Sequence, residues 1–239
     1  MEKELTDLLI KGAKAYNIEL SDLQIEKFLQ YKELLKEWNE KFNLTAIEED
    51  RDIILKHYID SLSILPYIPK KDVKMIDVGT GAGFPGIPVK IVLEGTRVTL
   101  LDSLDKRVKF LKEAIQVLKL DKINAVHGRA EDFGVMKEYR EQFDFVVARA
   151  VANLPVLLEY CLPFVKVGGF FLAMKGSNTD EIGNSSKALQ ILGGQIEEIR
   201  EITLPCSDMK RNIVLVRKLR QIPSKYPRKA GKPTKEPLI

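Results

Sequence analysis

The chain has 239 residues, of which 45% are hydrophobic and 30% charged, a balance typical of a folded globular protein. No apolar run approaches the roughly 20 residues that span a bilayer, and the start of the chain lacks the apolar core of a secretion signal, so we expect a cytoplasmic protein with no membrane partner. The net charge of +4 is uneven, because the segment from Lys218 onward holds seven basic residues and one acid.

The N-terminal part of the chain, residues 3–65, is predicted to be helical. Aromatic and leucine side chains recur at helical spacing after Ser21, which is a suitable N-cap. A further helix is expected over residues 50–65, ending before Pro66. We therefore expect an N-terminal helical extension, residues 1–69, that packs on the rest of the protein.

From residue 73 the pattern changes to alternating strands and helices. Strands are predicted at residues 73–78, 97–102, 123–127, 143–149 and 169–174. Helices are predicted at residues 86–94, 104–119, 153–165 and 179–192. Such alternation indicates a parallel sheet covered by helices.

The end of this region differs, because two strand-like runs at residues 195–204 and 212–218 are joined by a short loop. A connection this short requires antiparallel pairing. We therefore predict an α/β protein with a Rossmann-like core over residues 70–219, a seven-stranded mixed sheet and an antiparallel last strand. Residues 220–239 form a basic C-terminal tail with four prolines, expected to be extended or disordered until a partner binds.

The first predicted strand leads into a glycine-rich loop, Asp77-Val-Gly-Thr-Gly-Ala-Gly-Phe-Pro-Gly86. Glycines permit a tight turn and a close approach of the backbone to a ligand. Gly81, Gly83 and Gly86 fit the G-x-G-x-x-G pattern of dinucleotide sites, which would indicate an NAD-dependent oxidoreductase. Asp77, Gly79, Gly81 and Gly83 instead fit the D-x-G-x-G-x-G loop of methyltransferases that use S-adenosylmethionine.

We favour the S-adenosylmethionine interpretation, because a carboxylate at Asp77 would repel the pyrophosphate of a dinucleotide. A buried Asp77 needs partners, either the loop backbone or the ammonium of the cofactor. Asp102, at the tip of the second strand, is placed to accept hydrogen bonds from both ribose hydroxyls. Ser103 would share that role, and the alternative for Asp102 is to cap the following helix. A non-catalytic RNA-binding protein with a vestigial cofactor site is the remaining hypothesis.

Further candidates lie at the ends of the third and fourth strands. Ala130 and Glu131 are expected to meet the adenine of the cofactor, whereas His127 is interpreted as a structural hydrogen-bonding residue. Arg149 would hold a phosphate, a base edge or the carboxylate of the donor. Its alternative role is to neutralise Asp77 or Asp102.

The two cysteines are too few for a disulfide framework or a cysteine-rich zinc site, and we predict no metal. Cys161 lies in an apolar helix pattern and is expected in the core. Cys206 follows a proline after the sixth strand, away from the expected reactive centre. Neither is expected to act as a nucleophile.

Five segments together resemble one family. They are Asp77–Gly86, Ala148–Ala152, Asn43–Thr45, His57–Ser61 and Tyr226–Pro233. The combination is similar to the glucose-inhibited division protein B family, the guanine-N7 methyltransferases of 16S ribosomal RNA. The resemblance implies transfer of a methyl group from S-adenosylmethionine to N7 of a guanine in the 530 loop, with 16S rRNA or the small ribosomal subunit as partner. The cofactor contacts that it implies are Gly79, Phe84, Ala130, Glu131 and Arg149.

The chemistry of this reaction agrees with the absence of an obvious catalytic base. Guanine N7 carries a lone pair and no proton, so the protein mainly has to align acceptor and donor. We therefore name no catalytic residue and expect a monomer. Basic side chains are expected to bind RNA phosphates. The residues predicted for this role are Arg211, Lys225, Arg228, Lys229 and Lys232.

Overall fold

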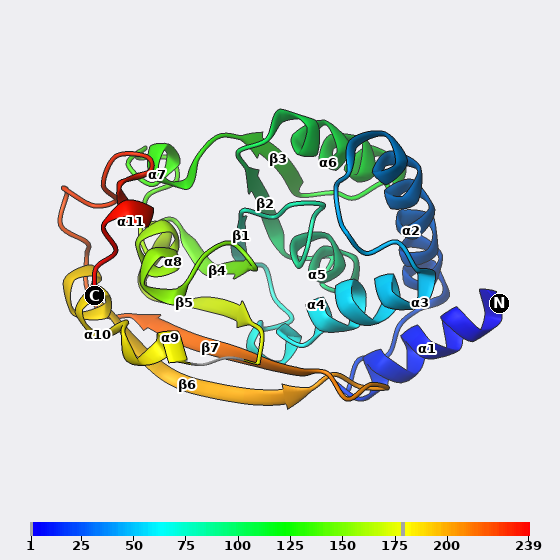
Figure 1. Ribbon diagram of the computed structural model, residues 1–239. Coiled ribbons are helices and arrows are strands. Elements are labelled where there is room, and N and C mark those ends of the chain that lie inside the picture. The colour runs from blue at the N-terminus through cyan, green and yellow to red at the C-terminus, as the bar shows by residue number, and fades with distance from the viewer. Residues whose placement is uncertain (1, 178–179) are drawn as a thin grey trace.

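The protein is built on one seven-stranded sheet with helices on both of its faces (Figure 1). The computed structural model describes residues 2–177 and 180–239. The strand order is β3-β2-β1-β4-β5-β7-β6. The strands are β1 (Lys74–Val78), β2 (Arg97–Asp102), β3 (Ile123–His127), β4 (Phe143–Arg149), β5 (Val165–Lys175), β6 (Gly194–Thr203) and β7 (Lys210–Lys218).

The pairing of the strands confirms the predicted mixed sheet. Strands β1 to β5 pair in parallel, and β7 runs antiparallel to both of its neighbours, β5 and β6. Strand β5 begins at Val165, four residues before its predicted start at residue 169. The glycine pair Gly168–Gly169 does not end the strand, because a shift in the register between β4 and β5 accommodates it.

The helices that follow the strands divide between the two faces. They are α5 (Gly86–Val92), α6 (Asp105–Val117), α7 (Ala130–Phe133), α8 (Leu154–Cys161), α9 (Asp180–Gly183), α10 (Ser186–Leu192) and α11 (Lys232–Lys235). The helix predicted at residues 179–192 is divided into α9 and α10, and its first residue lies outside the described residues. Within the described residues no helix is both long enough and apolar enough to cross a membrane.

Successive residues along each central strand pack into two separate hydrophobic cores. In β1 and β4, Met75 and Val147 belong to the core beneath α5 and α6, whereas Ile76 and Val146 belong to the core beneath α8 and α10. Because successive strand residues point to opposite faces, one apolar run supplies both layers. This explains why the central strands read as continuous apolar segments.

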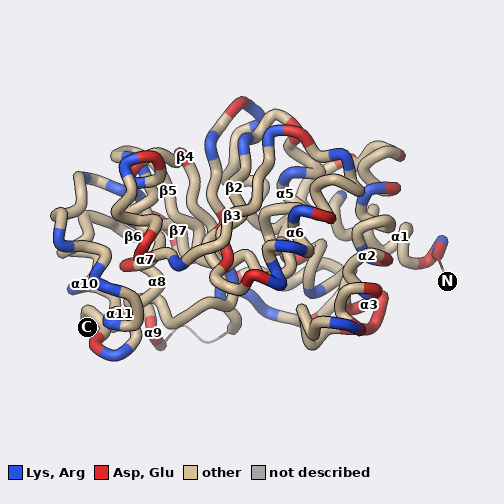
Figure 2. Tube along the Cα trace, turned by 90° about the horizontal axis from the view of Figure 1, so that it is seen from above, with Lys and Arg blue, Asp and Glu red and all other residues tan. Residues whose placement is uncertain are grey.

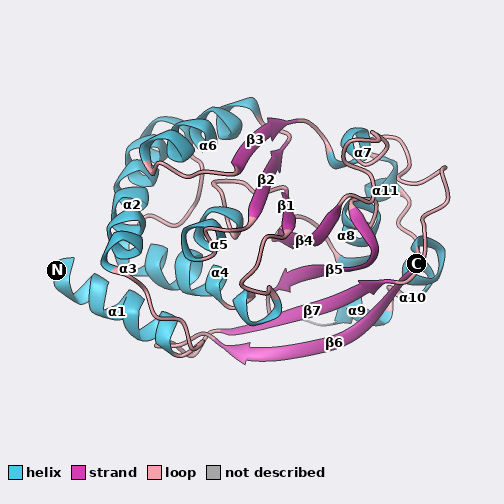
Figure 3. Cartoon of the chain, turned by 180° about the vertical axis from the view of Figure 1, so that it is seen from behind, coloured by secondary structure: helices cyan, strands magenta, loops and turns pink. Residues whose placement is uncertain are grey.

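The N-terminal extension is helical, as predicted. Its elements are α1 (Glu2–Lys14), α2 (Asp22–Phe42), α3 (Asp50–Asp52), the π-helix η1 (Ile53–Ile59), α4 (Asp60–Leu62) and the 3-10 helix η2 (Leu65–Tyr67). Ser21 caps α2 in a reciprocal box with Gln24. Helix α2 ends at Asn43, which adopts a left-handed conformation. Figure 3 shows these helices beside α5 and α6, far from α10 and α11.

The extension shares a core with the sheet. Leu9, Phe28 and Tyr58 are completely buried in the same cluster as Met75 of β1. The helices therefore fix the position of η1 relative to the carboxyl ends of the strands, where ligands bind in open α/β sheets.

The C-terminal segment, residues 220–239, is folded onto the protein, so the prediction of an extended or disordered tail is wrong. Tyr226 and Leu238 are buried in the core beneath α8 and α10. Arg140 donates hydrogen bonds to the carbonyl oxygens of Ile222 at 2.9 Å and Tyr226 at 2.8 Å. Composition failed here because the segment has few apolar residues, yet Ile222, Tyr226 and Leu238 are buried.

Candidate functional site

The glycine-rich loop follows β1 and depends on left-handed backbone at three positions. Gly79, Gly81 and Gly83 have φ values of 70°, 63° and 93°. A side chain at Gly83 would also collide with the Tyr31 hydroxyl, which donates to the carbonyl oxygen of Ala82. At Gly81 an added Cβ would meet no atom within 4 Å, so the backbone there faces open space. The loop therefore presents bare main chain at the carboxyl edge of the sheet.

Asp77 holds this loop to the start of α5. One carboxylate oxygen, Oδ2, accepts hydrogen bonds from the Thr80 hydroxyl at 2.6 Å and from the Gly86 amide at 2.8 Å. The other oxygen, Oδ1, is buried and has no hydrogen-bond partner within the described residues. Complete burial raises the pKa of Asp77 to about 7. Of the two partners predicted for Asp77, the loop supplies one, and Oδ1 stays buried without a partner in the part of the chain that is described.

A cavity of about 370 Å³ opens beside the loop, and we call it the loop cavity. Its lining comes from the ends of β1 and β2, from the start of α7, and from α8 and the C-terminal segment. The lining residues are Val78, Gly79, Leu101, Asp102, Ser103, Leu104, Gly128, Arg129, Ala130, Glu131, Val151, Tyr160, Gly231 and Thr234. Its volume falls within the range usual for small-molecule sites.

Asp102 is nearly buried at the tip of β2 and connects two loops. Its Oδ2 accepts from the Gly81 amide at 2.8 Å, and its Oδ1 accepts from the Leu104 amide at 2.9 Å, at the start of α6. This bond reaches the residue that precedes α6, and no side-chain hydrogen bond caps the first turn of α6 within the described residues. The two bonds do not use up the carboxylate, because each oxygen has a second lone pair. Asp102 and Ser103 both line the loop cavity.

The third strand supplies the far wall of the loop cavity. Ala130 and Glu131 lie in the first turn of α7 and line the cavity, as their predicted role requires. Oε1 of Glu131 accepts a hydrogen bond from the Gly231 amide at 3.1 Å. The His127 ring nitrogen Nε2 lies 3.0 Å from the carbonyl oxygen of Ser103, which confirms the interpretation of His127 as a structural hydrogen-bonding residue.

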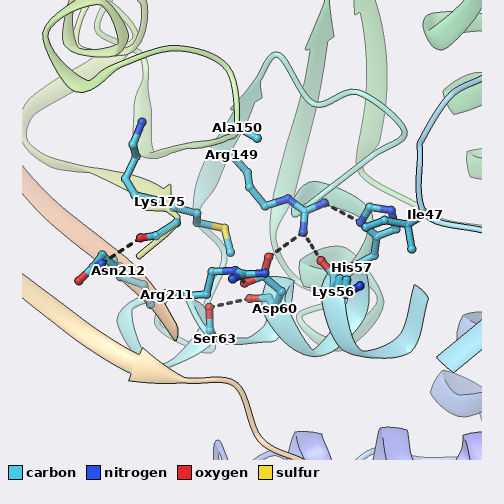
Figure 4. Close-up of a pocket in the computed structure, with 13 residues that line it drawn as sticks. Ile47, Lys56, His57, Asp60, Ser63, Arg149, Ala150, Lys175, Arg211 and Asn212 are labelled. Atoms are coloured by element: carbon cyan, nitrogen blue, oxygen red, sulfur yellow. Dashed lines mark hydrogen bonds and ion pairs between the residues drawn. The ribbon is translucent and has the colours of Figure 1, made fainter. Parts of the chain in front are cut away.

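A second cavity of about 350 Å³ lies between the ends of β4 and β5, the start of β7, and η1 (Figure 4). We call it the arginine cavity. Its lining residues are Ile47, Lys56, His57, Asp60, Ser63, Arg149, Ala150, Met174, Lys175, Gly176, Arg211, Asn212 and Ile213. Ala150 lines this cavity and the next residue, Val151, lines the loop cavity, so one short segment separates the two.

Arg149 is held by η1 and by Asp60. Its guanidinium donates to Asp60 Oδ2 at 2.9 Å, to the carbonyl oxygen of Lys56 at 2.8 Å and to His57 Nδ1 at 2.9 Å. The ion pair predicted as an alternative, with Asp77 or Asp102, is thus made with Asp60 instead. Figure 4 shows these side chains converging on one side of the cavity.

The tautomer of His57 follows from its neighbours. Because Arg149 donates to Nδ1, the proton of the neutral ring lies on Nε2, which is 3.0 Å from the Thr45 hydroxyl oxygen. Burial and the Arg149 charge lower the pKa of His57 to about 3. His57 therefore stays neutral and orients Arg149 rather than exchanging protons near neutral pH.

Phe84 lies beneath this network rather than in the loop cavity. Its ring is buried, stacks on the His57 ring at 4.2 Å between centroids, and carries the Arg149 guanidinium at 5.2 Å. A cation over an aromatic face is attracted by the ring. Phe84 thus supports Arg149 and connects the glycine-rich loop to the arginine cavity.

The residues predicted to bind RNA do not share one environment. Arg211 lines the arginine cavity and lies 3.4 Å from Asp60. Lys225, Lys229 and Lys232 are exposed on the C-terminal segment, and Figure 2 shows basic positions along the chain around α11. Arg228 instead forms a short ion pair with the buried carboxylate of Glu159, at 2.6 Å.

The cysteines occupy the places expected of them. Cys161 is buried in α8, and Cys206 is half-buried in the turn between β6 and β7. In the ranges 2–177 and 180–239 no group of metal-ligating side chains is found.

Several residues of these cavities had no sequence signal that identified them individually. Tyr160 of the loop cavity comes from the apolar helix α8, and Gly231 and Thr234 come from the C-terminal tail, for which the sequence predicts disorder. Asp60 and His57 were noticed only as part of a helical segment that resembles a family. The π-helical turn around them was not predicted, although such turns often occur at functional sites.

Comparison with known proteins gives a consistent result. The family model GidB, rRNA small subunit methyltransferase G, matches residues 24–214. The ribosomal RNA small subunit methyltransferase G of Acetivibrio thermocellus is 63% identical over 99% of this chain and 98% of its own length. The protein of that name from Alkaliphilus oremlandii is 54% identical over 98% of this chain and 99% of its own length. Nothing in these matches favours the NAD-dependent oxidoreductase.

Solved structures show the same core fold at low identity. M. jannaschii TYW2 in complex with AdoMet superposes with a TM-score of 0.54 and 16% identity, covering 69% of this chain and 76% of that one. Precorrin-6y C5,15-methyltransferase from Geobacter metallireducens gives a TM-score of 0.52 and 14% identity, covering 67% and 88%. The core is therefore that of the class I methyltransferases.

Proposed function

The chain belongs to the GidB family, the rRNA small subunit methyltransferases G, and we propose that its two cavities serve a single reaction. In this reaction the methyl group of S-adenosylmethionine is transferred to N7 of a guanine in the 530 loop of 16S ribosomal RNA. The observation that carries the proposal is the loop cavity, which is lined by Gly79 of the glycine-rich loop and by Asp102 at the tip of β2.

The loop cavity fits the cofactor in shape and in chemistry. Val78, Leu101 and Leu104 offer apolar surface to an adenine ring, and the Asp102 carboxylate retains lone pairs for ribose hydroxyls. The exposed main chain at Gly81 leaves room for a ligand. When bound, S-adenosylmethionine supplies an already activated methyl group. The residues that would hold it are Asp77, Gly79, Gly81, Gly83, Phe84, Asp102, Ser103, Ala130, Glu131 and Arg149.

We assign each of these residues to a part of the cofactor according to its position in the site. Asp102 and Ser103 would hold the ribose, and Glu131 the adenine edge. The free oxygen of Asp77 suits the ammonium group, and Arg149, at the border between the cavities, suits the carboxylate. Phe84 would act through Arg149, which it supports from below.

The arginine cavity is the proposed place of the acceptor guanine. It adjoins the loop cavity across the Ala150–Val151 peptide, so a base there lies next to the donor. Arg149, Lys175 and Arg211 give it a basic lining suited to RNA. Since N7 has no proton to lose, these side chains need only position the base, and no general base is required.

The remaining lysines would bind the RNA backbone outside the cavities. Lys225, Lys229 and Lys232 are exposed and suitable for phosphate contacts. Arg228 has a structural partner in Glu159, so we assign it a smaller share of RNA binding. The partner would be 16S rRNA or the small subunit, and we propose that the protein acts as a cytoplasmic monomer.

A methylation assay tests the proposal directly. The protein is incubated with labelled S-adenosylmethionine and either small ribosomal subunits or free 16S rRNA, and the modified nucleotide is mapped. Label at N7 of one guanine in the 530 loop is expected with at least one of the two substrates. Absence of label at any guanine N7 with both would refute the proposal.

A binding titration tests the cofactor assignment separately. Replacing Asp102 by alanine is expected to weaken S-adenosylhomocysteine binding by about 1–3 kcal/mol, because charged hydrogen bonds to the ribose are lost. Asp105→Ala is the matched control, since Asp105 is an exposed acid three residues away that does not line the cavity. Equal affinity in both variants would mean that Asp102 does not hold the ribose.

A further inference from the structure

The C-terminal segment reaches across α8 to the edge of the loop cavity. Two of its residues, Gly231 and Thr234, line that cavity. The Gly231 amide donates to Oε1 of Glu131, and the Thr234 hydroxyl oxygen lies 2.8 Å from the Tyr160 hydroxyl oxygen. Each contact joins the segment to a residue that itself lines the cavity. The segment therefore forms one side of the space rather than passing near it.

The segment is anchored just before these contacts by a buried ion pair. Glu159 of α8 is completely buried, and its carboxylate accepts hydrogen bonds from Arg228. The Arg228 amide and Nε donate to Oε1 at 2.8 Å and 2.9 Å, and Nη2 donates to Oε2 at 2.6 Å. A buried carboxylate deprived of its partner is strongly disfavoured, so lifting the segment from α8 carries a large energetic cost.

Apolar contacts fix the segment on both sides of this anchor. Tyr226 precedes Arg228 and is buried in the core beneath α8. Leu238 follows Thr234 and is buried in the same core. The stretch that carries Gly231 and Thr234 is thus held at both of its ends, which keeps it against the cavity.

We propose that the C-terminal segment is the outer wall of the cofactor site, and that the Arg228–Glu159 pair positions this wall against the nucleoside half of S-adenosylmethionine. The proposal deepens the proposed function and rests on it. Glu131 has a double role in this arrangement. One carboxylate oxygen holds the wall through Gly231, while no hydrogen bond within residues 2–177 and 180–239 occupies the other. Cofactor affinity therefore depends on a segment outside the seven-stranded core.

The first test introduces a large side chain on the C-terminal segment so that it occupies the loop cavity. Thr234→Trp places a large ring in the space for the nucleoside, and Lys235→Trp places the same ring on the exposed neighbour that does not line the cavity. Calorimetry with S-adenosylhomocysteine is expected to show binding weakened about tenfold or more by Thr234→Trp, and changed less than about twofold by Lys235→Trp. The melting temperature of each variant shows whether it is folded.

The possible outcomes distinguish a failure of the wall proposal from a failure of the proposed function. If Thr234→Trp binds S-adenosylhomocysteine as tightly as the unmodified protein, the segment is not a wall of the cofactor site. If the unmodified protein itself fails to bind S-adenosylhomocysteine, the proposed function falls first.

The second test addresses the positioning role of the ion pair. Glu159→Gln keeps the shape of the side chain and removes its charge. With a displaced wall, the KM for S-adenosylmethionine should rise about fivefold or more, while kcat at saturating cofactor and the KM for RNA stay within about twofold. A lower melting temperature with an unchanged KM for the cofactor would mean that the pair is only structural, and would overturn the positioning role.

Discussion

The two cavities at the carboxyl edge of the sheet are closed by segments far apart in sequence, and apolar anchors contribute more to one wall than to the other. The arginine cavity is closed by η1 and by the start of α4, where Asp60 lies between Arg149 and Arg211. The loop cavity is closed by the C-terminal segment, in which one buried ion pair, Arg228–Glu159, lies between two apolar anchors, Tyr226 and Leu238.

This difference has a consequence for how the two walls respond to change. A wall held by buried charges is sensitive to protonation and to the loss of one partner, because an unpaired buried charge is costly. A wall with apolar anchors on both sides of its ion pair is also sensitive to lost side-chain volume. Both walls pack against the same sheet, so substitutions in each wall test how the two walls differ.

The largest effect is expected at the centre of the charged wall. Asp60→Ala leaves Arg149 and Arg211 without their shared carboxylate and should lower the free energy of unfolding by about 3–5 kcal/mol. Asp52→Ala removes a half-exposed partner of Lys56 and should cost about 0–1 kcal/mol. Urea denaturation measures both. Similar small losses in the two variants would mean that the arginine cavity is not held together by charge.

The apolar wall should respond to a shortened side chain. Leu238→Ala is expected to cost about 2–5 kcal/mol of unfolding free energy, because a buried leucine leaves a cavity. Its neighbour Ile239 is 63% exposed, and Ile239→Ala should change the stability by no more than about 0.5 kcal/mol. If both substitutions were neutral in urea denaturation, the C-terminal segment would not be packed as described.

The pH response of the charged wall gives a smaller effect with a defined sign. His57 titrates near 3 in the folded state, below its ordinary value of 6.5. Its contribution to stability is therefore present above the ordinary value and is lost as the pH falls towards 3. Relative to His57→Gln, the unmodified protein should lose about 2–3 kcal/mol between neutral pH and pH of about 4.5. Parallel stability curves for the two proteins would contradict the neutral, buried state of His57.

The pH dependence of stability that arises from Asp77, near the end of β1, should have the opposite sign. The pKa of Asp77 is about 7 in the folded state, above its ordinary value of 3.8. Ionisation is easier in the unfolded chain, so this carboxyl reduces stability as the pH rises from its ordinary pKa to about 7. Compared with Asp77→Asn, the ligand-free protein should lose about 2 kcal/mol between pH of about 5 and 7. An identical pH dependence in both proteins would show that folding does not raise the pKa of Asp77.

Much of the fold was predictable because it is encoded locally. The apolar runs of β1 to β4 and the short hairpin connection give the mixed sheet directly. The acidic residue at the tip of β2 and the first turn of α7 were also placed correctly beside the glycine-rich loop. These features depend on neighbours in sequence, which periodicity and turn chemistry describe.

The missed features depend on pairs that are distant in sequence. Arg149 and Asp60 are 89 residues apart, and Arg228 and Glu159 are 69 residues apart. From local sequence, the candidate partners for Arg149 are Asp77 and Asp102, and no partner within the protein is predicted for the C-terminal segment. The proline-rich segment was interpreted as disordered because the buried surface that holds it belongs to α8 and the sheet, which composition cannot reveal.

The position of Gly231 and Thr234 also sets an order of events during synthesis. Chains emerge from the ribosome N-terminus first, so all strands from β1 to β7 leave the exit tunnel before these two residues do. A nascent chain with a complete sheet would still lack one side of the loop cavity. Under the proposed wall, tight binding of the methyl donor would begin only after Gly231 and Thr234 have left the tunnel and docked beside α8.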